Sequence, residues 1–499
     1  MAKLMWSKLL QPKRFRDQGT VQRTPSDNRT PFKKDFDTVC NSTILRRLQD
    51  KAQVFPLEQE DYARTRLTHS IEVMSIAESL GVQAASIINA SSDKYLGNTA
   101  AEKVSTKHYI NEIPNILKTA ALLHDMGNPP FGHLGEKIIG DWFKSNLGNL
   151  SFNSERKLVL NSSSEPKSTL EYMFKGQYAE DLKHFEGNAQ LFRLVTKLSL
   201  VVDENGMNLT FPVMASFIKY PTPSNRIDKN NLMTKKMGFF ASEEELYNRI
   251  NDTLSLNGYR HPLAFLLEAA DDIAYLTADI EDAHRKGLIS LQKIREYLEA
   301  EKNDNIVSIV IDAMKTYVNK AKEMGYEGIE DYVIHRLRVL IKGLMIDSMN
   351  DAFRDSYEDI MNAKFNKELI EISSAKCIAE ILRKIERENI YYCPRILENK
   401  TRAIAVITKL LETYVPAIVN WDENVDKNTD SSNNLLYLSL STNYRHMCNV
   451  ANKAYINMHN LLSKDFETMV YNKILLVTDQ ISGMTDTHAL TVFQMLAAN

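Results

Sequence analysis

The sequence predicts an all-α fold, and three observations lead to this prediction. Glycine and proline, with 18 and 14 residues in a chain of 499, are both below their average usage. Apolar residues recur at helical spacing in many stretches of the chain. The sequence contains neither a Pro-, Gly- or Ser-rich linker nor an internal repeat, so we expect helices packed into one body.

Four polar stretches interrupt the helical pattern. They lie near residues 92–107, 145–168, 202–208 and 423–434, and we interpret them as loops or insertions. Elsewhere, a hydrophobic content of 43% provides enough apolar side chains for a large buried core.

The chain begins with a basic arm, residues 1–35. Its lysines and arginines, set against few acidic residues, are Lys3, Lys8, Lys13, Arg14, Arg16, Arg23, Arg29, Lys33 and Lys34. The formal net charge of −3 argues against nucleic-acid binding as a global property, but this arm can meet a polyanion such as single-stranded DNA. The alternative is a solvated or subunit-bridging arm.

The composition also predicts the compartment. No apolar run approaches the roughly 20 residues needed to span a bilayer, and the start of the chain lacks the apolar stretch of a signal peptide. The 4 cysteines are scattered without CxxC spacing, which indicates neither a zinc knuckle nor a disulfide framework. We therefore expect a cytoplasmic protein with no membrane partner.

The most informative local feature is the adjacent pair His124 and Asp125. Pro114 suits the first turn of an apolar helix that would end at this pair. His133 and Glu136 follow at a spacing of three residues, which puts them on one face of the next helix. A His-Asp pair alone is expected about once by chance in this composition. Its neighbours make it a predicted metal site beside an acid/base pair.

Further ligands are needed, because one imidazole and one carboxylate hold a divalent ion weakly. Upstream, His69 lies at a predicted helix start, with Thr68 or Ser70 available as the N-cap residue. Downstream, residues 262–280 form a strongly apolar predicted helix with two acids, Asp271 and Asp272, in its middle. Charges seldom lie in such a position without a partner.

The helical phase of this second segment favours one of the two acids. Asp271, Tyr275 and Asp279 recur at four-residue spacing and share one face of the helix. Asp272 lies off that face and can cap or pair elsewhere. One helix face thus offers a ligand, an aromatic ring and a hydrogen-bond acceptor in a row.

The order His69, His124-Asp125, Asp271 resembles that of the HD-domain metal phosphohydrolases. The surrounding stretches resemble the deoxyguanosine triphosphate triphosphohydrolases (dGTPases) of bacteria, in the family's order along most of the chain. The matching stretches are residues 46–58, 64–70, 124–136, 184–190, 268–275 and 481–486.

The resemblance implies a domain organisation and an assembly. After the arm of residues 1–35 we expect an HD-type helical core over 36–290. A helical C-terminal region over 291–499 would contribute to the substrate pocket and to oligomer contacts. The family forms homohexamers.

The resemblance also implies the chemistry. The metal ligands would be His69, His124, Asp125 and Asp271, and the choice of Asp271 over Asp272 depends on the resemblance. Two imidazoles and two carboxylates without thiolate suit Mn²⁺ or Mg²⁺, or Co²⁺, Fe²⁺ or Ni²⁺, better than structural zinc. His133 and Glu136 match the family's catalytic pair. The expected reaction is hydrolysis of dGTP at the α-phosphate, which releases deoxyguanosine and intact triphosphate.

The resemblance extends to the substrate contacts. The residues that match phosphate contacts, or lie in a matching stretch beside them, are Arg66, His184, Asn188, Lys219, Tyr220 and Lys236. Gln53 and Asp279 match residues that read the sugar 3′-OH, and Tyr275 matches a ring that leaves little room for a 2′-OH. Arg445 lies in a stretch that reaches a neighbouring subunit's active site. Nearby, Asn443 replaces a family arginine, which leaves guanine selectivity and effector responses open.

Three other functions remain open. The chain can be a broad deoxynucleoside triphosphate triphosphohydrolase that a second nucleotide activates. It can be a single-stranded nucleic-acid-binding regulator with a vestigial site. A cyclic-nucleotide phosphodiesterase is the weakest of the three, and it would release a monophosphate.

Overall fold

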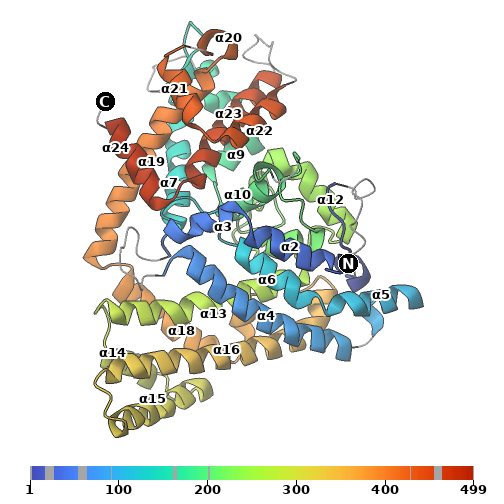
Figure 1. Cartoon of the computed structure of the whole chain (residues 1–499), viewed down its shortest axis with the longest axis vertical. Helices are drawn as coiled ribbons and strands as arrows, with labels where there is room; N and C mark the ends of the chain where they lie inside the picture. Colours follow the sequence, from blue (N-terminus) through green and yellow to red (C-terminus); the bar gives the residue numbers. More distant parts are fainter. Residues whose placement is uncertain are drawn as a thin grey trace.

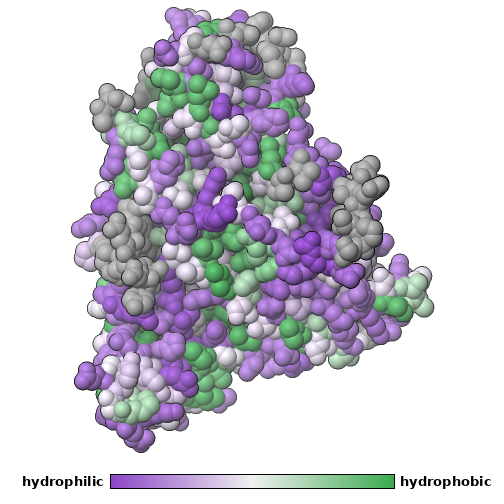
Figure 2. Space-filling model, viewed as in Figure 1, coloured by the Kyte–Doolittle hydropathy of each residue, from purple (hydrophilic) through white to green (hydrophobic). Residues whose placement is uncertain are grey.

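The computed structural model describes residues 3–16, 27–53, 64–91, 93–160, 166–200, 203–427, 429–453 and 464–497. Helices make up nearly all of the regular structure (Figure 1), which confirms the predicted all-α fold. The exception in the described residues is one antiparallel pair of strands, β1 (Leu150–Phe152) and β2 (Leu158–Leu160). Hydrophilic residues predominate on the face shown in Figure 2, with apolar side chains in separate patches between them.

The helices of the first half of the chain are α1 (Trp6–Leu9), α2 (Pro31–Cys40), α3 (Thr43–Arg47), α4 (Arg66–Ala90), α5 (Ala100–Ile110), α6 (Ile113–Leu123), α7 (His133–Asn146), α8 (Leu170–Met173), α9 (Gln177–Lys183), α10 (Gly187–Arg193), α11 (Phe211–Phe217) and α12 (Glu244–Leu254). The helices of the second half are α13 (Pro262–Arg285), α14 (Leu291–Glu299), α15 (Asn305–Glu323), α16 (Ile329–Met361), α17 (Leu369–Ile372), α18 (Lys376–Ile385), α19 (Pro394–Asn420), α20 (Glu423–Asp426), α21 (Ser432–Ser439), α22 (Thr442–Asn452), α23 (Lys464–Gly483) and α24 (Asp486–Ala497).

The helices that carry the predicted ligands pack against one another. Helix α4 packs along α6, and the two ribbons run side by side in Figure 1, while α13 packs against both α4 and the long helix α16. Leu80 of α4, Leu117 of α6 and Ile273 of α13 are fully buried in these contacts. Burial of apolar stripes therefore holds the site's three main helices in fixed positions.

The start of α4 differs from the sequence prediction. Thr65, not Thr68 or Ser70, is the N-cap residue. The Thr65 side chain accepts the backbone N–H of Thr68, and the backbone N–H of Thr65 donates to the Thr68 hydroxyl. Thr68 thus completes a capping box at the third helical position, which satisfies two N–H groups that a cap at Thr68 would leave unpaired.

Three of the four predicted loops contain regular structure. Residues 100–110 form α5, because Thr99 and Glu102 make a capping box that begins a helix without a strong apolar stripe. The stretch 145–168 contains the hairpin of β1 and β2, and 423–434 contains α20 and the start of α21. The two strands have three residues each and α20 has four, and α5 lacks a strong apolar stripe, so the hydrophobic pattern did not reveal them.

The described part of the basic arm is attached to the body. Trp6 is fully buried, and its indole N–H donates to the Tyr357 hydroxyl at 2.8 Å. Arg14 lies 2.6 Å from the buried carboxylate of Asp35. Arg23 lies outside the described residues. Several of the arm's charges therefore stabilise the fold.

Helix α19 connects the C-terminal region to the site. It packs against α7, α23 and α24, and in Figure 1 it runs beside them in the upper part of the molecule.

Two helical segments, Arg66–Ala90 and Ile396–Asn420, are long and apolar enough to cross a bilayer by length and composition alone. Core helices meet the same criterion, and Leu80 and Leu410 of these helices are fully buried here. This is weak evidence for a membrane segment.

Candidate metal centre and active site

A cavity of about 930 Å³ lies where α4, α6, α7 and α13 converge. The predicted site residues that line it are Gln53, Arg66, His69, His124, Asp125, His133, Asn188, Lys219, Tyr220, Lys236, Asp271, Tyr275 and Asp279. A volume of this size is typical of a pocket for a small-molecule ligand.

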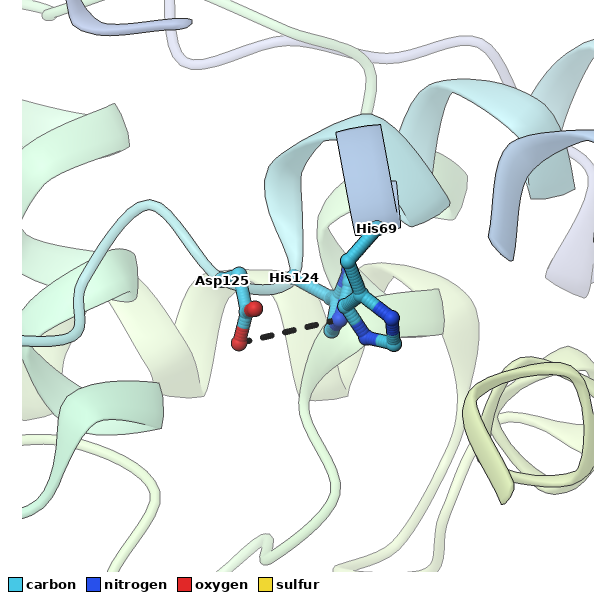
Figure 3. A group of neighbouring side chains, drawn as sticks. All are labelled: His69, His124 and Asp125. Carbon is cyan, nitrogen blue, oxygen red and sulfur yellow. Dashed lines mark ion pairs between the residues drawn. The ribbon is translucent and has the colours of Figure 1, made fainter. Parts of the chain in front are cut away.

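The four predicted metal ligands meet at one wall of this cavity. Donor atoms of His69, His124 and Asp125 lie within 4.8 Å of one another (Figure 3). Asp271 Oδ1 lies 3.1 Å from His69 Nε2 and 3.4 Å from His124 Nε2. The ligands come from α4, the end of α6 and the middle of α13. The helix packing described above therefore brings together residues that are far apart in sequence.

The tautomer of His124 is the one that can bind a cation at this position. His124 Nδ1 lies 2.6 Å from the carbonyl oxygen of Ala121, so Nδ1 carries the proton and donates it. His124 Nε2 then presents a lone pair, and it has no hydrogen-bond partner among the described residues. This lone pair lies close to the carboxylates of Asp125 and Asp271. A divalent ion bound among these donors would satisfy all of them.

Asp125 is held in place from both sides. Arg66 donates to Asp125 Oδ2 at 2.8 Å, and the amide of Asn128 donates to Oδ1 at 2.6 Å. Burial opposes ionisation of Asp125, but the nearby positive charge, chiefly that of Arg66, holds its pKa well below the usual range. Gly132, with a φ of 58°, leaves room for the guanidinium, since a Cβ there would lie 2.0 Å from Arg66 Nη2.

The neighbouring acids Asp271 and Asp272 have opposite environments. Both are partly buried, and desolvation opposes ionisation of Asp271, but the charge of Lys219 lowers the pKa of Asp271 well below its usual range. Burial and the charges of Glu268 and Asp271 raise the pKa of Asp272 well above it. Asp271 is therefore the ionised member of the pair, which favours it as the ligand.

His133 and Glu136 form a hydrogen-bonded pair at the start of α7. His133 Nδ1 lies 3.0 Å from Glu136 Oε2, and the Gly187 backbone N–H donates to Oε1 at 3.0 Å. The charge of Glu136 raises the pKa of His133. Burial opposes ionisation of Glu136, but His133 lowers the pKa of this carboxyl to about 2. The imidazole side chain is 77% exposed, so a ligand can reach it.

Comparison with known proteins agrees with this geometry. The HD domain family model matches residues 66–159, which include His69, the His124-Asp125 pair and the His133–Glu136 pair. A deoxyguanosinetriphosphate triphosphohydrolase-like protein of Listeria innocua is 37% identical over 99% of both chains. The deoxyguanosinetriphosphate triphosphohydrolases of Yersinia pestis and Serratia proteamaculans are 29% and 30% identical over 94% of both chains.

The chain belongs to the deoxyguanosinetriphosphate triphosphohydrolase family. It is a metal-binding hydrolase with an HD domain, and its His-His-Asp cluster has the donor atoms to hold a divalent ion. The dGTPase family resemblance found in the sequence is confirmed.

In this member of the dGTPase family, two buried side-chain oxygen atoms of the cavity lack a hydrogen-bond donor among the described residues. Gln53 Oε1 and Asp279 Oδ1 have no hydrogen-bond partner among the described residues. Burial and the neighbouring Glu386 raise the pKa of Asp279 well above its usual range. Both residues line the same cavity as the ring of Tyr275. Unpaired buried acceptors are costly, so these positions suit a ligand that carries a hydroxyl group.

Two predicted contacts of the dGTPase family lie outside this cavity. His184, the residue after α9, lines an adjoining cavity instead. Arg445, on α22, lies over the ring of Tyr437 and lines neither cavity of its own chain. The expected role of Arg445 in a neighbouring subunit stays a prediction.

One group of lining residues was missed by the sequence analysis. It comes from α18, the π turn η8 (Glu386–Ile390) and the start of α19: Arg383, Glu386, Arg387, Tyr391, Tyr392, Ile396, Asn399 and Lys400. The only sequence feature that indicates these residues is a pair of tyrosines beside a dense run of charges at 383–392. Such a run is more often a solvated helix face, so it did not indicate a site.

Residues 481–486, one of the stretches that resemble the family, contact two segments that border the active-site cavity. Asp486 Oδ1 accepts the backbone N–H of Phe131, and Oδ2 accepts that of Ala52, both at 2.9 Å. The buried Lys51 donates to the carbonyl oxygens of Asn128 and Ser482 at 2.6 and 2.7 Å. The start of α24 thus holds the loop between the metal ligands and His133 against the segment that carries Gln53.

Proposed function

We propose that the chain hydrolyses dGTP to deoxyguanosine and inorganic triphosphate through attack of water on the α-phosphate. The observation that carries this proposal is one cavity lined by the four candidate metal ligands, by His133 with its hydrogen-bond partner Glu136, and by unpaired acceptors on Gln53 and Asp279 that lie among the described residues. The printed names of the Yersinia and Serratia relatives support dGTP as the substrate.

The metal ion would be held by His69, His124, Asp125 and Asp271. When bound, a divalent ion polarises a phosphate oxygen, orients water and offsets charge in the transition state. A donor set of nitrogen and oxygen supports Mn²⁺ or Mg²⁺, with Co²⁺, Fe²⁺ and Ni²⁺ as alternatives.

His133 is placed to act as the general acid. Its Nδ1–H donates to Glu136, and the charge of Glu136 raises the pKa of the ring, so the imidazolium form carries a second proton on Nε2 that can be transferred. As water forms the new bond to the α-phosphorus and gives up a proton to the solvent, the bond to the 5′ oxygen breaks and its electron pair leaves with that oxygen. A proton from His133 neutralises the leaving oxygen, which yields deoxyguanosine. All three phosphorus atoms stay together in the other product.

The cations of the cavity support a triphosphate ligand. Lys236 Nζ lies 2.8 Å from Glu186 and Lys219 Nζ lies 3.3 Å from Asp271. Arg66 is at the same wall. A triphosphate carries about four negative charges, and these three side chains can contact it in addition to their present partners.

The long helix α13 supports a position for the sugar. Asp271, Tyr275 and Asp279 line the cavity at steps of about 6 Å along one helix face. With the α-phosphate near Asp271, the deoxyribose would lie along the Tyr275 ring and its 3′-OH near Asp279. A ribose 2′-OH would then meet the ring, which excludes ribonucleotides by a steric clash.

Phosphorus NMR of the reaction products tests this function. We expect inorganic triphosphate to appear with dGTP and Mn²⁺ or Mg²⁺, and no turnover after chelation of the metal. Release of a monophosphate would indicate a phosphodiesterase. All four substrates, tested singly and in mixtures, distinguish a strict dGTPase from a broad, nucleotide-activated enzyme. Salt-dependent binding of single-stranded DNA without turnover would favour a regulator.

We further propose the division at residues 35 and 290 and a homohexamer, which the resemblance implies, and a cytoplasmic location, which the composition predicts. Light scattering coupled to gel filtration measures the assembly directly. A subunit in the hexamer would receive Arg445 from its neighbour.

A further inference from the structure

A second cavity of about 420 Å³ adjoins the active-site cavity. Four residues line both of them: His133, Glu186, Lys235 and Lys236. His133, the proposed acid, therefore lies at the junction. We call the second cavity the basic groove, for the lysines Lys137, Lys144, Lys183, Lys229, Lys235 and Lys236 that line it.

The basic groove has an excess of positive charge. Its six lysines compare with three acidic residues, Glu136, Asp141 and Glu186. Asp141 is shared, because both Lys137 and Lys144 pair with it. Lys183 and Lys235 also pair with Glu180 and Glu368, which do not line the groove. The lining itself still carries more ammonium groups than carboxylates, and a concave surface with an excess of one charge concentrates counter-ions.

The groove is built by packed helices, so its lysines have defined positions. Helix α7 packs against α9, and Lys137 and Lys144 project from α7 while Lys183 ends α9. Phe185 and Met237, both buried, form part of its apolar lining. His184, which the sequence predicted as a substrate contact, lies here, with Nε2 3.3 Å from Glu180.

The direction of the substrate leads into this groove. In the proposed function the sugar extends from the metal ligands along α13 toward Asp279. The phosphate chain must extend the other way, toward Lys219 and Lys236. Lys236 and its neighbour Lys235 belong to both cavities, so the terminal phosphate would lie at the entrance of the groove.

We propose that the basic groove is a binding site for linear inorganic polyphosphate, and that triphosphate occupies it on leaving the active site. The inference rests on the proposed function, which supplies triphosphate as the product. As the triphosphate moves along the groove, each phosphate group passes from contact with one lysine to contact with the next. The deoxynucleoside leaves from the opposite side of the active-site cavity. The triphosphate then leaves the active-site cavity without passing the part of the cavity that binds the sugar.

The test uses lysines that line only the groove. A triple variant, Lys144→Gln, Lys183→Gln and Lys229→Gln, removes three charges, and Gln has nearly the helix propensity of Lys. Titration calorimetry with the Mg²⁺-loaded enzyme measures the Kd of inorganic triphosphate in the same Mg²⁺ buffer. We expect the Kd to rise on the order of tenfold, because each lost pair of charges weakens binding modestly. Its salt dependence should also become shallower.

A matched control removes three charges elsewhere. Lys293, Lys315 and Lys427 are 50%, 56% and 59% exposed and line neither cavity. Their replacement by Gln should leave the Kd of triphosphate unchanged. Equal weakening in both triple variants would show a general charge effect and overturn the proposal, as would an unchanged Kd in the groove variant. Competition by a single-stranded oligonucleotide that is lost in the groove variant, with triphosphate binding intact, would also overturn it.

The failure of this proposal is distinguishable from that of the proposed function. Phosphorus NMR identifies the product without reference to the groove. If the product is not triphosphate but the groove variant still binds triphosphate weakly, the function is wrong and the polyphosphate site stands. If triphosphate is the product and the groove variant binds it as the wild type does, the site is wrong and the function stands.

Discussion

Asp486 and Phe131 lie 355 positions apart in the chain, yet the Asp486 carboxylate accepts the Phe131 backbone N–H at 2.9 Å. Phe131 has a φ of 63°, in the left-handed region that is strained for a residue with a side chain. The next two residues are Gly132 and His133. A carboxylate from α24 therefore stabilises an unfavourable backbone conformation directly before the proposed general acid.

We predict that Asp486 acts as a positioning residue. Asp486→Ala removes acceptors from the N–H groups of Phe131 and Ala52, so kcat should fall about 10- to 100-fold with a smaller change in KM. Asp486→Asn keeps one acceptor oxygen and should recover part of kcat. Steady-state kinetics of both variants, with Asp312→Asn as an exposed control, provide the measurement. Equal losses in kcat for Ala and Asn, with a matching fall in Tm, would indicate a purely structural role.

The metal assignment is tested by a pair of adjacent substitutions. Asp271→Ala should abolish both metal content and turnover, because this ionised carboxylate lies between His69 and His124. Asp272→Ala should keep stoichiometric metal, since that residue pairs with Arg383 at 3.9 Å instead. Metal analysis of the purified variants decides the question, and the reverse pattern would show that the assignment is wrong.

Replacement of His133 should separate chemistry from binding. His133→Ala is expected to bind metal and substrate nearly normally and to lose roughly 10²- to 10⁴-fold in turnover. Because Glu136 raises the pKa of His133, Glu136→Gln should move the alkaline fall of kcat to lower pH. A raised KM with unchanged kcat in His133→Ala would identify a binding residue instead.

The sugar position on α13 predicts a pattern across three substrates. Asp279→Ala should weaken transition-state binding of dGTP, calculated from kcat/KM, by about 1–3 kcal/mol. It should hardly affect 2′,3′-dideoxy-GTP, which lacks the hydroxyl. Tyr275→Ala should weaken discrimination against GTP. Measurement of kcat/KM for dGTP, GTP and dideoxy-GTP tests both expectations. Equal losses on all three would mean that these residues only support the fold.

A buried histidine far from the chemistry predicts how stability depends on pH. His261 is the N-cap residue of α13: its Nδ1 accepts the Leu263 N–H, and Nε2 lies 3.1 Å from the Leu9 carbonyl oxygen. Burial lowers the pKa of His261 from 6.5 to about 4. The folded state therefore holds this ring neutral, and the unfolded chain takes up the proton first.

It follows that about 3 kcal/mol of stability is fully present above pH 6.5 and is lost as the pH falls through 4. His261→Asn keeps a capping side chain without this titration. Its unfolding free energy should be lower at pH 7 but should vary less between pH 7 and 4. Urea denaturation across this range measures the difference, and parallel curves for both proteins would contradict the prediction.

The local features of the site followed from the sequence. Helix phase placed Asp271, Tyr275 and Asp279 on one face, and the structure brings all three to one cavity. Likewise, the spacing of His133 and Glu136 gave their hydrogen bond at the start of α7. These relationships span less than three helical turns, so the regular geometry of the helix is enough to predict them.

Relationships between distant segments required the tertiary structure. The ionised state of Asp271 depends on the charge of Lys219, which lies 52 positions away in the chain. The contacts of Asp486 and the lining from η8 bring together segments hundreds of residues apart.

The sequence by itself determined the helical class, the ligand types and the family. The packing of α4, α6, α13 and α19 decided which charges neutralise one another and where the cavity continues into the basic groove. The reason is physical: periodicity reports the face that a helix buries, whereas burial and Coulomb energies depend on distances between helices that periodicity does not specify.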